Sequence, residues 1–221
     1  KGEVLGLAGL VGSGTTEIVE AIFGLKRIDE GSITFLGKPY EAPAPYKSLR
    51  RGIGMLAKDR KHSLLLHMPI YCNIALSNAY DFVRFKIVRL QKKERTESEI
   101  YAKKLRLKAA SVQHLASSLS GGNQQKVVIS RLLCAKCKLF IMDDPTRGID
   151  VGAKIDVYNA INELTVEGNS VILISSQLPE LLGISDRILV ARDGTIAGEF
   201  DARSCTQEEI MSIIAGGEKH E

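Results

Sequence analysis

Cysteine and long hydrophobic runs are scarce in this sequence of 221 residues. Of its four cysteines only Cys134 and Cys137 lie close together, and a single C-x-x-C pair lacks the second pair of ligands that a structural zinc site needs. We therefore expect packing or surface cysteines in a reduced, cytoplasmic protein. No apolar run approaches the roughly 18 residues of a membrane-spanning helix, and no charged-then-apolar secretory leader opens the chain.

A large excess of one charge is also missing. The 30 basic and 26 acidic side chains leave a net charge of +4, spread along the chain, which argues against a dedicated nucleic-acid surface. The most basic stretch, from Arg84 to Lys108, carries acidic residues among its lysines and arginines and is typical of a solvated helical face. The remaining composition, 44% hydrophobic, is that of a globular protein with one substantial core and room for a small subdomain.

Short apolar runs predict the strands of an α/β fold. They lie at residues 4–8, 52–56, 138–144 and 170–176. The last two end in polar residues, which is typical of buried parallel strands with functional groups at their C-terminal ends.

Helical patterns separate these runs. Helices are expected at about 15–24, over 91–110 and over 151–168, and the pattern is mostly helical from about 68 to 133. Residues 32–40 predict a hairpin that turns at Gly37-Lys38, and residues 188–200 predict one that turns at Asp193-Gly194. The prolines that mark an irregular connection after the first hairpin are Pro39, Pro43 and Pro45.

The stretch GLVGSGTT, residues 9–16, has most features of a phosphate-binding loop. Gly9, Gly12 and Gly14 allow the tight curvature that points successive N–H groups at one anion, and the following helix N-terminus adds positive potential. Thr16 occupies the hydroxyl position that would bind Mg²⁺. Thr15 stands where the lysine of such loops is expected, so the loop alone is equally compatible with a simple strand–turn–helix connection.

A dinucleotide fingerprint is the alternative interpretation of this loop. It requires a third glycine, and Glu17 occupies that position.

Two further segments carry chemistry. The strand KLFIMDD ends in Asp143, which can hold Mg²⁺ through a water, and in Asp144, which can polarise an attacking water. Residues 117–126, SSLSGGNQQK, place a serine hydroxyl and two glycine amides at a helix N-terminus and so form a second candidate anion site.

These segments resemble the ATP-binding-cassette ATPases. LSGGNQQK resembles the family's signature, and DDPTRGIDVGAK resembles its Walker B and D-loop segment. Two further segments, KDRK after GIGML and ISSQLPELLGISDRI, narrow the resemblance to one branch of the family. These sequences are similar to the ATPase subunits of bacterial monosaccharide importers (ribose, galactose and xylose type), and specifically to the second of their two fused cassettes.

The resemblance implies a fold and a division of the chain. The fold class is α/β: a P-loop NTPase (RecA-like) core with a mostly parallel sheet and an inserted α-helical subdomain. The core would comprise about 1–67 and 134–200, the helical subdomain about 68–133, and the tail 201–221. The chain would be one nucleotide-binding domain that begins inside a longer polypeptide.

The resemblance also assigns roles residue by residue. The catalytic positions would be Asp144, Ser176 in the place of the switch histidine, and Lys58 in the Q-loop. Thr16 and Asp143 would bind the metal. The residues that would contact ATP are Gly9, Gly12, Ser13, Gly14, Thr15, Thr16, Glu17, Ser120, Gly121, Gly122, Asn123 and the D-loop Asp150.

Four of these positions depart from the family pattern: Thr15, Lys58, Asp144 and Ser176. Loss of the lysine removes a charge-assisted phosphate contact, Asp is one methylene shorter than Glu, and serine cannot carry the charge of histidine. We therefore expect weak nucleotide binding and poor hydrolysis here, with the signature serving the partner cassette. A catalytically silent regulatory or assembly cassette, and a soluble ABC ATPase outside transport, are the alternatives.

The family further implies the cofactors ATP and Mg²⁺ and several partners. These are a second cassette, an integral-membrane sugar permease and, indirectly, an extracellular or periplasmic sugar-binding protein, with no nucleic acid. The protein would lie in the cytoplasm on the inner face of the cell membrane. The sugar is not identified, because its selectivity is expected in the permease and the binding protein.

Overall fold

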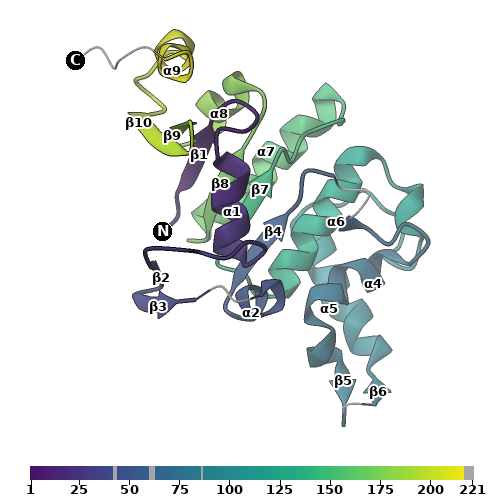
Figure 1. The fold of residues 1–221 in the computed structure, drawn as a ribbon. Helices are drawn as coiled ribbons and strands as arrows, with labels where there is room; N and C mark the ends of the chain where they lie inside the picture. The colour runs from purple at the N-terminus through teal and green to yellow at the C-terminus, as the bar shows by residue number, and fades with distance from the viewer. Residues whose placement is uncertain (42–43, 60–62, 86, 217–221) are drawn as a thin grey trace. The chain divides into compact units, whose positions relative to one another are not determined.

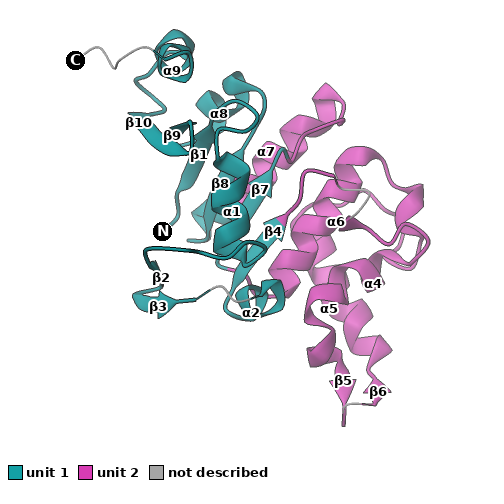
Figure 2. Ribbon diagram, in the orientation of Figure 1, with its two compact units in different colours: residues 1–55, 138–144, 164–221 teal, residues 56–137, 145–163 magenta. Residues whose placement is uncertain are grey.

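The computed structural model describes residues 1–41, 44–59, 63–85 and 87–216, which divide into two units (Figure 2). Unit 1 comprises residues 1–55, 138–144 and 164–221, and unit 2 comprises residues 56–137 and 145–163. Pro43, the end of KDRK and the last five residues of the tail lie outside the described residues.

Within its described residues, unit 1 contains a six-stranded sheet in the order β10-β9-β1-β8-β7-β4 (Figure 1). Strand β1 is parallel to β8 and β9, β7 is parallel to β8, and β10 is antiparallel to β9. The mostly parallel α/β sheet predicted from the apolar runs is therefore confirmed. The strands are β1 (Val4–Ala8), β4 (Ile53–Leu56), β7 (Leu139–Asp143), β8 (Ser170–Ile174), β9 (Arg187–Arg192) and β10 (Thr195–Asp201).

The core of unit 1 forms where helix α1 (Thr15–Phe23) meets the sheet. Val19 of the helix and Ile141 and Ile174 of the strands belong to one buried hydrophobic cluster. The remaining helices of the unit are α2 (Pro45–Arg50), α8 (Leu178–Ile184) and α9 (Gln207–Ile214).

The first hairpin differs in detail from the prediction. Strands β2 (Ile33–Phe35) and β3 (Lys38–Tyr40) turn at Leu36-Gly37, both with positive φ, rather than at Gly37-Lys38. Pro39 lies inside β3, which pairs only with β2 among the described strands, and Pro45 is the first residue of α2. An edge strand and a helix N-terminus both tolerate the missing N–H, so these prolines do not break structure.

Unit 2 is mostly helical, and the predicted helical stretch 68–133 lies wholly within it. Its elements are α4 (Ile70–Ala75), η1 (Leu76–Phe82), β5 (Val83–Arg84), β6 (Val88–Arg89), α5 (Gln91–Lys104), η2 (Ala116–Ser118), α6 (Gly121–Cys134) and α7 (Val151–Val166) as far as Glu163. The antiparallel hairpin of β5 and β6 was not predicted.

Helix α5 is shorter than predicted. The composition predicted helix over 91–110, but Arg106 takes φ 50° and the amide of Leu107 reaches back 2.9 Å to the carbonyl of Ala102. This left-handed residue with a backward hydrogen bond is a common way to end a helix.

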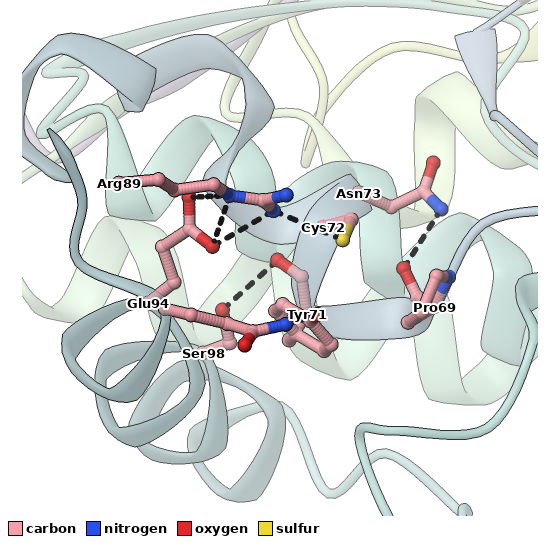
Figure 3. Close-up of polar contacts among 8 residues, drawn as sticks. Pro69, Tyr71, Cys72, Asn73, Arg89, Glu94 and Ser98 are labelled. Atoms are coloured by element: carbon pink, nitrogen blue, oxygen red, sulfur yellow. Dashed lines mark hydrogen bonds and ion pairs between the residues drawn. The ribbon is translucent and has the colours of Figure 1, made fainter. Parts of the chain in front are cut away.

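Polar contacts join the helices of unit 2 (Figure 3). Arg89 holds both carboxylate oxygens of the buried Glu94 at 2.9 Å and donates to Sγ of Cys72 at 3.2 Å. Ser98 of α5 donates to the carbonyl of Tyr71 in α4 at 3.2 Å. Together these contacts fix α4, α5 and the β5–β6 hairpin to one another.

The cysteines take packing positions, as expected. Cys134 and Cys137 are buried, and burial raises the pKa of each thiol to about 12. Among the described residues no group of three or more His, Cys, Asp or Glu could hold a metal ion. In the same part of the chain, no helix combines the length and apolar character needed to cross a membrane.

Candidate functional site

The GLVGSGTT stretch forms a tight loop between β1 and α1. Gly12 and Gly14 have φ of 87° and 103°, in the left-handed region that suits glycine. The amide of Ser13 donates to the carbonyl of Leu10 at 2.9 Å, and the amide of Ile18 donates to the carbonyl of Gly14 at 3.0 Å. The chain therefore curls just before the N-terminus of α1, the geometry that a phosphate group can use.

The β9–β10 turn supports this loop from within unit 1. The amide of Gly194 donates to the carbonyl of Ser13 at 3.1 Å, and a Cβ on Gly14 would lie 3.3 Å from Cα of Gly194. A Cβ on Gly9 would lie 2.7 Å from the carbonyl of Ala191. Two of the loop glycines thus serve close packing on β9–β10 as well as curvature. The sequence predicted the turn, but nothing local in it indicated that it supports the loop.

Thr15 and Thr16 open helix α1. Thr15, in the place of the expected lysine, is buried, whereas Thr16 is partly exposed. Glu17 is exposed and its carboxylate lies 3.3 Å from Nζ of Lys26. A backbone hydrogen bond at its own position, and then the Lys26 ammonium, lower the pKa of Glu17.

Parallel pairing places the end of β7, which carries Asp143, level with the end of β1, which leads into the glycine loop. Ile174 of β8 is in register with Leu7 of β1 on one side and with Asp143 of β7 on the other. Leu7 and Asp143 therefore lie about 10 Å apart, two strand spacings, at the same edge of the sheet. The chain continues from these strand ends into the glycine loop, into Ser175-Ser176 and into Asp144.

Asp144 is tied to the end of β8. Its backbone has φ 48°, and its amide donates to the carbonyl of Ile174 at 2.8 Å. Its Oδ1 accepts from the amide of Ser176 at 2.8 Å and from the Ser176 hydroxyl at 3.1 Å. The carboxylate is buried, and these bonds occupy one of its two oxygens. Two of the four positions that depart from the family pattern, Asp144 and Ser176, therefore contact each other directly.

Within unit 1 the residues fit a phosphate group and a divalent cation. The glycine loop and the α1 N-terminus offer amides, and Thr16 and Asp143 are the hydroxyl and the carboxylate from which a cation could draw protein ligands. Mg²⁺ is often held this way, by one or two side chains together with substrate phosphates and waters.

The segment LSGGN forms the start of α6 in unit 2. Ser120 precedes the helix, and its Oγ accepts from Nδ2 of Asn123 at 2.9 Å. Oδ1 of Asn123 accepts in turn from the amide of Lys108 at 2.8 Å. Asn123 therefore fixes the serine hydroxyl and the preceding loop together, leaving the exposed serine at the helix N-terminus with Gly121.

Close packing and an ion pair hold this helix to α7. A Cβ on Gly122 would lie 2.5 Å from Cβ of Ala153, so only glycine fits there. Nζ of the buried Lys126 lies 3.1 Å from Oδ2 of Asp156. These contacts position two predicted segments, the signature and the D-loop, within unit 2.

The remaining predicted residues of unit 2 are exposed. Asp150 accepts from the amide of Ala153 at 2.9 Å, which is the bond of a helix N-cap. Lys58 lies exposed just after β4. The predicted set is thus divided: the loop, Asp143, Asp144 and Ser176 share unit 1, and Lys58, the signature and Asp150 share unit 2.

Comparison with known proteins agrees with this geometry. Residues 1–147 match the family model described as ABC transporter. The chain is 44% identical over 217 residues to the ribose import ATP-binding protein RbsA of Bacillus subtilis, covering 98% of this chain and 44% of that protein. It is 46% identical over 219 residues to the xylose import ATP-binding protein XylG of Thermoanaerobacter pseudethanolicus, covering 98% of this chain and 43% of that protein. The chain thus spans less than half the length of these relatives.

Solved structures share the fold. A nucleotide-free ATP-binding cassette from an ABC transporter is 26% identical with a TM-score of 0.78, covering 97% of this chain and 85% of that one. The ADP conformation of an ATP-binding cassette of an ABC transporter is 25% identical with a TM-score of 0.77, covering 98% and 85%.

Proposed function

The chain belongs to the ABC transporter family of ATP-binding proteins, and from that membership we propose that it is a cassette that couples ATP binding and hydrolysis to the import of a monosaccharide. The relatives' names support the sugar, since they are ribose and xylose import proteins. Because the chain corresponds to less than half of each relative, we propose that a second cassette, fused upstream in the same polypeptide, completes the ATPase.

The cofactors proposed for this cassette are ATP and Mg²⁺. The amides of the Gly9–Gly14 loop and the N-terminus of α1 would hold the phosphates, and Thr16 and Asp143 would provide protein ligands for the metal. When bound, Mg²⁺ neutralises charge on the phosphate oxygens. The chain's own part is to orient the phosphates on its amides and to hold the carboxylates at the sheet edge.

This cassette's own site is proposed to bind weakly and hydrolyse poorly. Thr15 cannot make the charge-assisted contact of a lysine, a loss of about 1.5–3 kcal/mol, or one to two decades of affinity. Asp144 is short, and one of its oxygens is committed to the amide and hydroxyl of Ser176. A general base must reach the attacking water, and a displacement near 1 Å can cost about a hundredfold in rate. The Asp144–Ser176 contact is the observation that carries this proposal.

The signature is proposed to serve the partner cassette. Ser120 and the amides of Gly121 and Gly122 stand at the N-terminus of α6, a site suited to the phosphate of a nucleotide bound elsewhere. Asn123 fixes the serine by a hydrogen bond to its hydroxyl. Asp150 accepts a hydrogen bond from an amide in the first turn of α7 and so caps that helix. Head-to-tail pairing of the cassettes would then produce one competent composite site from this signature and the other cassette's loop.

The proposed partners follow from the same role. They are an integral-membrane sugar permease and, through it, an extracellular or periplasmic sugar-binding protein. The proposed location is the cytoplasmic face of the cell membrane.

The test compares two sets of substitutions in the full-length two-cassette protein. Ser120→Ala and Gly121→Asp should abolish most ATPase activity, whereas Thr16→Ala and Asp143→Asn should leave most of it. Radiolabelled ribose or xylose uptake by cells should follow the ATPase rates. Loss of ATPase in the Thr16 and Asp143 variants with harmless signature changes would overturn the assignment of the weak site.

A catalytically silent regulatory cassette is the second candidate, favoured by the combined presence of Thr15, Asp144 and Ser176. It predicts that Ser120→Ala also leaves the ATPase rate and the uptake unchanged. The same experiment therefore separates the two candidates.

A further inference from the structure

The tip of the β5–β6 hairpin exposes a group of apolar side chains. Phe85 is 76% exposed, Ile87 is 86% exposed and Val88 is 54% exposed. Tyr80, in the preceding η1, is also largely exposed. The two strands connect η1 to α5 in the chain and lie at one end of unit 2 (Figure 2). Single exposed apolar residues are ordinary, but a group of them on one projection indicates a surface that is covered in the working protein.

Folding alone does not explain the aromatic residue at this tip. Phe85 has φ 52°, a backbone conformation in which glycine or asparagine is usual and a bulky side chain is strained. Its ring gains little from burial, because it is exposed. The guanidinium of its sequence neighbour Arg84 lies 4.9 Å from the ring centroid.

Charge distinguishes this tip from the other apolar hairpin tip. In the β2–β3 hairpin Leu36 has nearly the same geometry, with φ 51° and 69% exposure. Residues 30–41 around it contain one lysine and two glutamates, whereas residues 83–93, VRFKIVRLQKK, contain five basic residues and no acidic one. Of these two hairpins, the one that carries Phe85 therefore combines apolar side chains with an excess of basic residues.

The base of the hairpin is anchored to α4 and α5. Arg89 of β6 binds both oxygens of Glu94 in α5 and donates to Sγ of Cys72 in α4 (Figure 3). An open hollow of about 690 Å³ lies beside this base, lined by Leu90, Lys92 and Thr96 among others. Lys92 and Lys93 line the hollow together with Glu97, whose carboxylate lies 3.8 Å from Nζ of Lys93.

We propose that the β5–β6 hairpin inserts its apolar tip into the headgroup region of an anionic lipid bilayer. Apolar burial and the attraction of basic residues to acidic lipids act together in such contacts, and neither suffices alone for weak amphipathic segments. Phe85, Ile87 and Val88 supply the apolar burial. Arg89 is paired with Glu94 and Lys93 with Glu97, so the attraction to acidic lipids comes from the other basic residues of the run, such as Arg84 and Lys92. The inference goes beyond the proposed function, since it uses neither the nucleotide loop nor the signature.

The absence of tryptophan from the sequence allows a direct test. Phe85→Trp places the only tryptophan of the chain at the tip, and Leu36→Trp places it at the matched tip of β2–β3. Vesicles of phosphatidylglycerol and phosphatidylcholine are added to the 221-residue chain without nucleotide. We expect the Phe85→Trp emission to move to shorter wavelength and the Leu36→Trp emission to stay unchanged. No shift in Phe85→Trp, or equal shifts in both variants, would overturn the proposal.

Vesicle co-sedimentation gives a second measurement. Phe85→Ser should weaken partitioning about tenfold or more, and Arg84→Gln about fivefold, with Leu36→Ser unchanged. Equal binding by Phe85→Ser and the parent chain would refute lipid insertion. If Phe85→Trp responds to the detergent-solubilised permease but not to vesicles, the tip contacts protein and the lipid proposal fails. Because nucleotide is absent throughout, none of these failures bears on the ATPase assignment.

Discussion

Oδ1 of Asp144 accepts two hydrogen bonds from Ser176, one from the backbone amide at 2.8 Å and one from the hydroxyl at 3.1 Å. The buried carboxylate that follows β7 is thereby joined to Ser176, an exposed residue two positions beyond the end of β8. A shorter acid and a small hydroxyl residue fit together here, where a longer acid and an imidazole would need more room.

Loss of this acceptor should destabilise the protein. Asp144→Ala removes the acceptor of both hydrogen bonds from the exposed Ser176. Each bond contributes about 0.5–1.5 kcal/mol net, so we expect about 1–3 kcal/mol less free energy of unfolding. Asp144→Asn keeps the oxygen and tolerates the left-handed backbone, so it should cost less than about 1 kcal/mol. Urea unfolding of both variants measures the difference. Equal losses would show that charge, rather than the hydrogen bonds, matters.

Nucleotide affinity should respond to the missing lysine. Thr15→Lys is expected to tighten ATP binding about tenfold or more, through a charge-assisted phosphate contact. Calorimetric titration of the chain, with and without Mg²⁺, measures the change, and Thr15→Met controls for side-chain length without charge. Unchanged affinity in Thr15→Lys would mean that the loop is already compensated or is not the site.

Gly122 is expected to tolerate no side chain. Gly122→Ala would bring two methyl carbons to 2.5 Å, and the resulting shift of α6 should cost about 1–3 kcal/mol. Ala153→Gly in the same chain should recover part of that loss. Gly152→Ala is the matched control, because its Cβ would meet only Oδ1 of Asp150 at 3.5 Å. Thermal unfolding is measured for the parent, the two single variants and the double variant. If the cause is steric, only Gly122→Ala loses much stability; if alanine is unfavourable throughout this region, Gly152→Ala loses as much.

Replacing Asp156 should destabilise the protein more than replacing its ion-pair partner Lys126. The Lys126 side chain is 4% exposed and that of Asp156 is 37% exposed. Asp156→Asn leaves an ammonium buried without its counterion and should cost about 3–5 kcal/mol, whereas Lys126→Met leaves a carboxylate that water can reach and should cost clearly less. Denaturant unfolding of both variants and of the double variant tests this order. The reverse order would mean that Asp156 depends on the pair more than Lys126 does.

Stability should fall at alkaline pH because of two buried thiols. Burial raises the pKa of Cys134 and Cys137 from 9.0 to about 12, so the unfolded chain loses these protons first. Their contribution is fully present below about pH 9 and is lost between about pH 9 and 12. Each thiol should contribute a slope of about 1.4 kcal/mol per pH unit in that window.

Cys137→Ala checks this slope by urea unfolding at a series of pH values. The variant should lose stability less steeply than the parent above about pH 9, while the two slopes agree at neutral pH. Parallel curves over the whole range would assign the alkaline loss to other groups.

Local pattern predicted the elements well where one face of a segment is buried. The runs 138–144 and 170–176 became β7 and β8, and residues 151–168 became α7, because buried parallel strands and long helices have distinct apolar patterns. The β5–β6 hairpin was missed because its strands have two residues each and its apolar side chains face away from the core.

The sequence by itself determined the α/β class, the family, the positions of the glycine loop, acidic strand end and signature, and the missing lysine, because each is a property of consecutive residues. Only the tertiary structure decided that Ser176 holds Asp144, that Gly194 supports the loop at Ser13, and that Gly122 must remain small beside Ala153. These partners lie tens of residues or more apart in the chain. Their contacts depend on which strands pair and which helices cross, and that arrangement is selected by burial of the whole core rather than by any local pattern.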